Sequence, residues 1–162
     1  MPTRINRFLK SSWDAIVLAR AGVERLKLKV HISSIIKTDI MLPAVGQGAL
    51  GIETRADNKA VNNVIKSIHH EHTYKSILAE RALLKALEGG CQVPIGAFAE
   101  VKQNGLYLDA TVGSLDGSLT FRKKTRGSSV KPEKLGRTLA KDLLKAGAKS
   151  ILNEIYHSVR VG

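Results

Sequence analysis

The single cysteine of the chain, Cys91, is the residue best suited to covalent chemistry. It follows a predicted helix that ends at Gly89-Gly90 and precedes a predicted strand, so we expect it on a loop, whereas a lone cysteine is most often a small buried hydrophobe. The C-terminal end of a helix disfavours a thiolate, which argues against a strongly activated nucleophile of the protease type. The position still permits slow, single capture of a good electrophile.

A glycine-rich segment, Gly46-Gln47-Gly48-Ala49-Leu50-Gly51, has the spacing G-x-G-x-x-G. A dinucleotide-binding loop with this spacing needs a strand before it and a helix after it, whereas the segment here overlaps an alternating, strand-like run. We therefore expect the glycines to permit a tight bend or a close backbone approach.

A histidine-rich segment, His69-His70-Glu71-His72, contains residue types that bind metals. Its spacing is not that of an H-E-x-x-H site, adjacent histidines at a helix start point in different directions, and the sequence contains no second ligand cluster. The segment therefore favours solvated capping residues, and we predict no metal site.

The chain is strongly basic, with 26 Lys and Arg against 14 Asp and Glu and a net charge of +12. Such an excess favours an anionic partner: nucleic acid, phosphate or a polycarboxylate. Arginine recognises carboxylate and phosphate well through bidentate geometry, although a solvated basic face is the usual alternative. The basic residues gather in two places: Arg4, Arg7, Lys10, Arg20, Arg25, Lys27 and Lys29, and then Arg122, Lys123, Lys124 and Arg126.

Length and composition indicate a chain able to build its own core, with 162 residues of which 43% are hydrophobic. One cysteine allows no intramolecular disulfide and suggests a reducing compartment. No apolar run approaches the roughly 18 residues of a membrane span, and charges interrupt the N-terminal segment where a secretory signal would be apolar. We expect a cytoplasmic protein with no membrane partner.

The sequence pattern of residues 1–68 predicts a partial α/β fragment. Its strands are short apolar or alternating runs, and its helices have apolar residues at helical spacing, with Thr3 and Asp57 as possible caps. No strand that could pair with this fragment precedes it. The expected elements are helices at residues 3–12, 21–26 and 57–68, strands at 13–19 and 49–54, and an irregular segment at 30–48.

The rest of the chain predicts an α+β unit, a three-stranded antiparallel meander with helices on one face. Asn104-Gly105 and Asp116-Gly117 are hairpin turn signals between strands expected at residues 93–102, 106–114 and 119–126. A helix at residues 73–88 precedes the meander, and Pro132 begins a long helix in which Gly147 is a possible kink. The inward residues expected are Ile77, Leu78, Leu84 and Leu87 in the earlier helix and Leu135, Leu139, Leu143, Ile151, Leu152 and Ile155 in the later one.

Several motifs together resemble those of porphobilinogen deaminase, also called hydroxymethylbilane synthase, and their order and spacing fit that family. The resemblance runs from about Thr3 to the C-terminus. The motifs are Ile16-Val17-Leu18-Ala19-Arg20-Ala21-Gly22, Leu42-Pro43-Ala44-Val45-Gly46-Gln47-Gly48-Ala49, His69-His70-Glu71, Ala79-Glu80-Arg81-Ala82, and Leu87-Glu88-Gly89-Gly90-Cys91-Gln92-Val93-Pro94-Ile95-Gly96.

The resemblance implies a transferase of heme and tetrapyrrole biosynthesis that condenses four porphobilinogen units into hydroxymethylbilane and releases ammonia. A dipyrromethane cofactor would be joined by a thioether to Cys91. Arg4 and Arg25 match arginines that bind the carboxylates of cofactor or substrate, and Ala19 matches a position whose backbone lies beside the cofactor. Gln47, with Gly48, matches a segment that passes between two domains, and we expect Gln47 to bind substrate.

The implied chemistry accounts for the charge and for the cysteine. Each porphobilinogen carries an acetate and a propionate, and burying such carboxylates is expensive unless arginines pair with them. The electrophile formed when ammonia leaves porphobilinogen needs little thiolate activation, which agrees with the position of Cys91 at a helix end.

The resemblance also implies a domain assignment and an incomplete enzyme. Residues 1–48 resemble the end of the second domain, 49–68 the segment that completes the first, and 71–162 the third, cofactor-carrying domain. The family chain is about twice as long, and no residue here matches its catalytic aspartate. We therefore expect the complete enzyme to be a monomer, as the family is. We also expect this chain to need a missing N-terminal half and to be inactive alone.

Two other hypotheses stay open from the sequence. One is a small basic RNA-binding α+β protein, which the charge and the meander favour. Aromatic residues make up only 4% of the chain, and Phe98, Tyr107 and Phe121 are scattered, which argues against base stacking and against a nucleic-acid partner. The other is a non-catalytic remnant with the same fold.

Overall fold

The computed structural model describes the backbone of residues 2–88 and 93–160, and the side chains of residues 2–88 and 93–156. The chain divides into two compact units, residues 1–37 and residues 38–162. Among the described residues, no helix is both long and apolar enough to cross a membrane.

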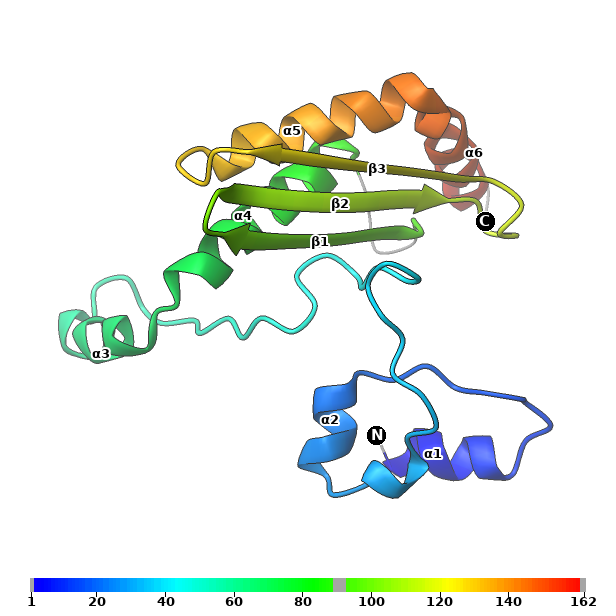
Figure 1. Ribbon diagram of the computed structural model, residues 1–162. Helices are drawn as coiled ribbons and strands as arrows, with labels where there is room; N and C mark the ends of the chain where they lie inside the picture. Colours follow the sequence, from blue (N-terminus) through cyan, green and yellow to red (C-terminus); the bar gives the residue numbers. More distant parts are fainter. Residues whose placement is uncertain (1, 89–92, 161–162) are drawn as a thin grey trace. The chain divides into compact units, whose positions relative to one another are not determined.

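The second unit is built on a three-stranded antiparallel sheet in the order β1-β2-β3 (Figure 1). Its strands are β1 (Ile95–Lys102), β2 (Gly105–Gly113) and β3 (Thr120–Gly127). Gly105 begins β2 with φ +140°, and a Cβ there would lie 2.7 Å from the carbonyl oxygen of Gly127, so the turn requires glycine. The predicted meander and its first turn are confirmed.

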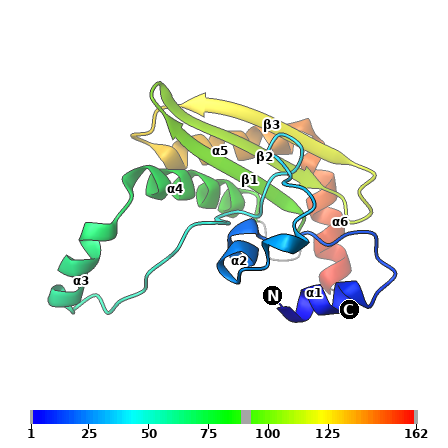
Figure 2. The ribbon, with the colours of Figure 1, turned by 60° about the horizontal axis from the view of Figure 1, so that its bottom comes forward.

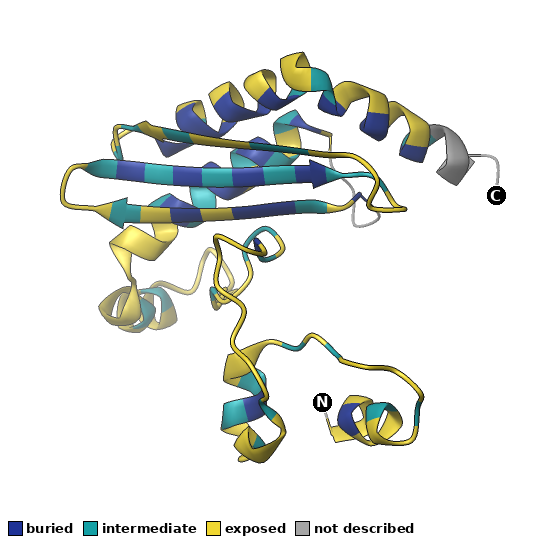
Figure 3. Cartoon of the chain, turned by 45° about the vertical axis from the view of Figure 1, so that its right-hand side comes forward, coloured by how far each residue is buried: buried dark blue, intermediate teal, exposed yellow. Residues whose placement is uncertain are grey.

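Helices cover one face of this sheet, as predicted (Figure 2). They are α4 (Glu71–Ala86), α5 (Pro132–Leu143) and α6 (Lys149–Arg160). Burial alternates along β2, where the side chains facing the helices are buried and the others are half-buried (Figure 3). The largest fully buried side chains of this core are Leu83, Leu87, Leu106, Leu108, Leu139, Leu143 and Val112.

The long C-terminal helix breaks at Gly147, also as predicted. A π-helical segment, Leu144–Ala148, joins α5 to α6, and Gly147 adopts φ +117° within it. A Cβ on Gly147 would lie 2.7 Å from the Cζ atom of Phe121, so the break also brings the chain against β3. All six leucines and isoleucines that were predicted to face inward here are buried.

The buried face of α4 differs from the prediction. Ala79, Leu83 and Leu87 are buried against the core, whereas Ile77, Leu78 and Leu84 are only half-buried. The reason is the close approach of α5, because a Cβ on Gly136 would lie 2.1 Å from the carbonyl oxygen of Ala79. Packing at this distance selects the face of α4 that contains Ala79, so leucine spacing was right for Leu87 but wrong for the other three residues.

The two strands expected before residue 88 do not form in the described part of the chain. Trp13 is 53% exposed within the first, and Leu50 is 92% exposed within the second. An extended segment becomes a strand only when a neighbour accepts and donates its ladder hydrogen bonds, and these segments have no such neighbour. The described part of residues 1–68 is therefore helix and irregular chain, without the predicted strands.

The helices of this region form close to where the sequence predicts them. They are α1 (Pro2–Leu9), α2 (Arg20–Arg25) and α3 (Lys59–Ile65), with 3₁₀ turns at Lys29–His31 and Lys66–Ile68. Ile5 and Val23 are buried, whereas Leu9 at the end of α1 is exposed. Asn58 caps α3 by accepting from the backbone N–H of Val61 at 3.2 Å, so the expected cap, Asp57, is wrong by one residue.

We predict that Gly136→Ala destabilises the second unit because the added methyl group cannot fit between α5 and the backbone of α4. Overpacking of this kind costs about 1–3 kcal/mol. Urea unfolding followed by circular dichroism should show the loss. Gly51→Ala is the matched control, because a Cβ on Gly51 meets nothing within 4 Å. Equal stability of the two variants would contradict the close approach of the helices.

Candidate functional site

The expected carboxylate-binding arginines lie on the two helices of the first unit. Arg4 lies in α1 and Arg25 in the last turn of α2. Both side chains are exposed, and neither has an ion pair or hydrogen bond among the described residues. Arg20 differs, since its Nε donates to Glu24 Oε1 at 2.8 Å. Arg4 and Arg25 are therefore free to bind an anion, and Arg20 is held within its own helix.

Ala19 is the N-cap residue of α2. Its carbonyl oxygen accepts from the backbone N–H groups of Gly22 at 3.1 Å and Val23 at 3.3 Å. These two hydrogen bonds fix the backbone at Ala19 and occupy its carbonyl oxygen. A ligand beside Ala19 would therefore meet a rigid backbone and not an unpaired carbonyl acceptor.

Gln47 lies at the exposed tip of a turn between two glycines with positive φ, Gly46 at +75° and Gly48 at +91°. The backbone N–H of Gln47 donates to the carbonyl of Ala44 at 3.0 Å. No helix follows in residues 49–58, so the glycines serve a tight bend, as expected, and not a dinucleotide-binding loop. The turn presents the Gln47 side chain outward.

Glu80 holds this turn against the core. Its side chain is only 4% exposed, and its Oε2 accepts from the backbone N–H of Gly46 at 2.7 Å. Its Oε1 accepts from the backbone N–H of Ala99 at 2.7 Å. One carboxylate therefore joins α4, the outer edge of β1 and the Gln47 turn.

The segment before the turn follows the same edge of the sheet. Pro43 accepts from the backbone N–H of Ala97 at 3.0 Å, and Ala44 forms an isolated bridge with Gly96. A Cβ on Gly96 would lie 3.0 Å from the Cβ of the buried Leu42. The free edge of β1 is thus covered by residues 42–46.

Burial raises the pKa of Glu80 above its usual range, and the N–H donors of Gly46 and Ala99 offset part of that effect. The Glu80 carboxylate loses hydration on burial and gains two short hydrogen bonds from backbone N–H groups. These two N–H groups must therefore stay in place for the buried carboxylate to be stable.

Cys91 lies outside the described residues, but the chain on both sides of it is anchored. Leu87 and Val93 are buried in the core. Glu88 adopts φ +54°, a left-handed conformation at the end of α4, and its carbonyl oxygen accepts from the hydroxyl group of Tyr156 in α6. Position and direction of the chain are therefore set immediately before and after residues 89–92.

The histidine-rich segment makes capping contacts. His70 is the N-cap of α4, and its Nδ1 accepts from the backbone N–H of Thr73 at 3.3 Å. His69 Nε2 lies 3.0 Å from Glu71 Oε2. Among the described residues, no group of three or more histidine, cysteine, aspartate or glutamate side chains is placed to hold a metal ion.

The basic residues of β3 are largely bound within the protein. Arg122 pairs with Asp109 through two contacts of 3.0 and 2.7 Å, and it also donates to the carbonyl oxygens of Thr38 and Asp39. Lys124 lies 3.2 Å from Asp109. Burial would raise the pKa of Asp109, but the hydrogen bonds from Arg122 and Lys124 outweigh it and lower that pKa. This cluster is a structural network rather than an open anion site.

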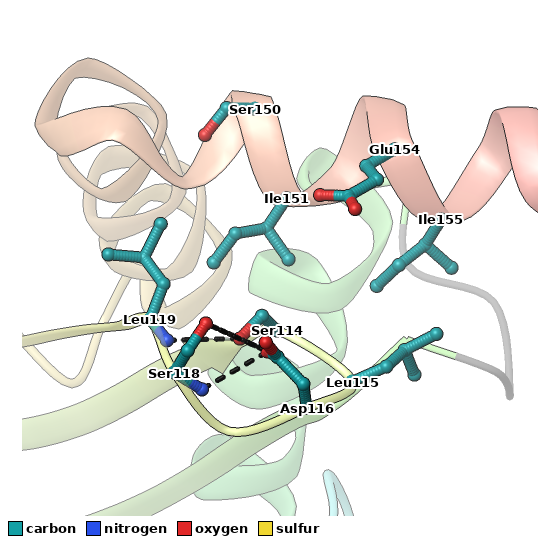
Figure 4. A pocket seen from close by; sticks show the side chains of 9 residues that line it. All are labelled: Ser114, Leu115, Asp116, Ser118, Leu119, Ser150, Ile151, Glu154 and Ile155. Atoms are coloured by element: carbon teal, nitrogen blue, oxygen red, sulfur yellow. Dashed lines mark hydrogen bonds between the residues drawn. The ribbon is translucent and has the colours of Figure 1, made fainter.

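A pocket of about 360 Å³ lies between the β2–β3 hairpin and α6 (Figure 4). Its polar groups bond to one another, since Asp116 accepts from the hydroxyl of Ser114 at 2.5 Å and from the backbone N–H of Ser118 at 3.1 Å. These donors lower the pKa of Asp116 to about 2. The Oδ1 oxygen of Asp116 is therefore already occupied by donors of the same turn.

Two family models match the chain in succession. The model described as porphobilinogen deaminase, dipyromethane cofactor binding domain, matches residues 1–63, and the model described as porphobilinogen deaminase, C-terminal domain, matches residues 74–145. Together the two ranges cover most of the chain. The chain belongs to the porphobilinogen deaminase family.

Curated relatives have the same name. The porphobilinogen deaminase of Carboxydothermus hydrogenoformans is 48% identical over 155 residues, which are 96% of this chain and 50% of the relative. Those of Chlorobium phaeobacteroides and Chlorobium luteolum are each 49% identical, over 94% and 96% of this chain and 50% and 51% of the relatives. The chain therefore spans about half the length of the curated relatives it matches. The comparisons give no support to the RNA-binding alternative.

Two residues in the site of this porphobilinogen deaminase family member had no role in the sequence analysis. Glu80 lies in a motif that carried the resemblance, and the signal available was a glutamate on the face of α4 that also contains Ala79 and Leu83. Tyr156 had no such signal, because its contact with Glu88 spans 68 positions in sequence.

We predict that Glu80→Gln releases the Gln47 turn. A glutamine offers one acceptor oxygen where two backbone N–H groups need one each, and a buried unsatisfied group costs about 1–3 kcal/mol. Urea unfolding should show this loss, and amide hydrogen exchange should speed up at Gly46 or Ala99. Glu100→Gln, on the exposed side of β1, is the control that should leave both unchanged. Protected amides in Glu80→Gln would contradict the assigned contacts.

The pH dependence of stability tests the Asp116 turn. The native pKa of about 2 lies below the ordinary value of 3.8, so the unfolded chain takes up the proton first. The contribution of the charge is full above pH 3.8 and disappears as the pH falls to about 2. Wild type should exceed Asp116→Asn in unfolding free energy at pH 6 but not at about pH 2. Asp142→Asn, on the exposed surface of α5, is the control and should change the unfolding free energy little at either pH. A difference in unfolding free energy between wild type and Asp116→Asn that persists at about pH 2 would contradict the assigned contacts of Asp116.

Proposed function

We propose that this chain supplies the C-terminal part of a hydroxymethylbilane synthase, which condenses porphobilinogen units into hydroxymethylbilane with release of ammonia. The observation that carries the proposal is the succession of two porphobilinogen deaminase models along one chain. Relatives with that name at 48–49% identity support it further. The reaction belongs to heme and tetrapyrrole biosynthesis.

Cys91 is the proposed attachment point of the dipyrromethane cofactor through a thioether. The model named for that cofactor matches residues 1–63 and supports the cofactor, while Cys91 lies in the range 74–145 of the C-terminal domain model. Support for the attachment point comes from the resemblance of the Cys91 motif and from the anchored chain on both sides of residues 89–92. The exposed, unpaired guanidinium groups of Arg4 and Arg25 fit a cofactor with several carboxylates. When bound, the cofactor supplies the free pyrrole end to which porphobilinogen is added.

The other roles follow from chemistry at each position. Arg4 and Arg25 bind carboxylates of cofactor or substrate, because bidentate charge-assisted bonds offset the loss of hydration. Gln47 offers an amide to substrate from a turn that Glu80 holds in place. Ala19 contributes a fixed backbone surface beside the cofactor.

The proposed assembly needs the rest of the family fold. Residues 1–48, 49–68 and 71–162 correspond to the end of the second domain, the segment completing the first, and the third domain. Leu50, Val64 and Ile68 are exposed in the middle segment, which is the state expected of a segment whose partners lie elsewhere. The chain alone lacks the family's catalytic aspartate. A cytoplasmic location and a monomeric complete enzyme stay predictions.

A reconstitution experiment tests the proposal. The chain is purified alone and after co-expression with the N-terminal half of the Carboxydothermus relative, and both are given porphobilinogen. We expect hydroxymethylbilane only from the reconstituted pair, together with a mass increase on Cys91 equal to two linked pyrroles. Cys91→Ser is the control and should carry no added mass. Turnover by the chain alone, or an unmodified cysteine in an active pair, would overturn the corresponding part of the proposal.

A second prediction concerns Arg25. In the reconstituted enzyme, Arg25→Gln should raise KM for porphobilinogen or weaken cofactor retention by about tenfold or more, because a charge-assisted hydrogen bond contributes about 1.5–3 kcal/mol. Arg20→Gln is the matched control on the same helix, since Arg20 pairs with Glu24. Steady-state kinetics should show little change for Arg20→Gln. An equal effect of both substitutions would indicate damage to α2 instead of a lost ligand.

A further inference from the structure

An apolar groove of about 840 Å³ runs along the outer side of α4 and continues onto α5. Leu78 and Ala82 form part of its lining on the side of α4 turned away from the core and are half-buried, while Leu84 lines it from a position nearer to Glu80. Helix α4 is therefore apolar on two sides, and the second side has no partner within the described part of the chain.

Cations surround this apolar surface. Arg81 and Lys85 line the groove from α4, one turn apart, and Arg137 lines it from α5. All three side chains are exposed, and none has an ion pair or hydrogen bond among the described residues. Glu133 is the only acidic residue in the lining, so the groove is positive around an apolar floor.

The groove lies away from Glu80 and the Gln47 turn within the second unit. An α-helix turns by about 100° per residue, so Leu78, Ala82 and Lys85 project from the side of α4 opposite to Glu80. Glu80 faces β1 and the Gln47 turn, which lies within the range matched by the cofactor-binding model. Binding in the groove would leave that connection free.

We propose that this groove docks an acidic amphipathic helix of a separate partner protein. Its apolar floor suits the apolar face of a helix, and its three cations suit acidic residues on both flanks of that face. A second copy of this chain is a poor occupant, because each copy carries a net charge of +12 and would repel the other. This inference goes beyond the proposed enzymatic function and does not depend on it.

The test uses a fluorescein-labelled synthetic helix of about four turns, with leucine on one face and glutamate on the others, and the full chain. Anisotropy titration at physiological salt should show binding, and Arg81→Glu/Arg137→Glu should weaken it by about tenfold. The matched control is Lys59→Glu/Lys123→Glu, which makes the same change in net charge at exposed lysines outside the groove. Circular dichroism checks that each variant is folded.

Each further outcome decides the proposal. Weaker binding of Leu78→Ser, and of a peptide with the same composition but scrambled leucines, would support an apolar groove. Equal weakening by both charge-reversal pairs, or equal binding of the scrambled peptide, would show general attraction to a basic protein and overturn it. Loss of peptide binding when the N-terminal half of the Carboxydothermus relative is bound would show an interface inside the family fold, and would overturn the separate partner.

Discussion

The buried carboxylate of Glu80 is the interaction on which the arrangement of the second unit depends. Each of its oxygens accepts one backbone N–H at 2.7 Å, from Gly46 on one side and Ala99 on the other. At the edge of β1, the Glu80 carboxylate accepts the backbone N–H of Ala99, which a carbonyl group of a further strand would otherwise accept. The irregular chain at residues 42–46 then lies along β1 where a further strand would pair, and the backbone N–H groups of Ala97 and Ala99 at this edge are bonded to Pro43 and Glu80.

This constraint acts together with the anchors around Cys91. Helix α4 connects the two, because Glu80 lies in its middle and Leu87 and Glu88 follow its end. The hydroxyl of Tyr156 adds a contact from α6 to the carbonyl of Glu88. In the proposed function, a cofactor attached at Cys91 would have to stay in register with the residues that bind its carboxylates. A rigid helix fixed at both points meets that requirement better than a long free loop.

The sequence predicted those elements whose signals are local. The Asn104-Gly105 turn, the alternation along β2 and the break at Gly147 are each contained within a few residues, and all are present. The wrong predictions needed distant information: the face of α4 is chosen by Gly136, and the strands expected at residues 13–19 and 49–54 lack neighbours. For the site, the family resemblance predicted Arg4, Arg25 and Gln47, which stay predictions, and nothing in the sequence indicated the contact of Tyr156 with Glu88.

Net charge alone could not distinguish among the possible anionic partners, and the contacts of the cations narrow the choice. Arg122, Lys124 and Arg126 bond to Asp109 and to the carbonyl of Asn104, so these three side chains already have partners within the sheet. The unpaired guanidinium groups lie elsewhere, on short helices and beside an apolar groove. Isolated arginines next to apolar surface suit ligands that combine carboxylates with hydrophobic bodies. Acidic pyrroles and acidic amphipathic helices both have that character, whereas a phosphate backbone does not.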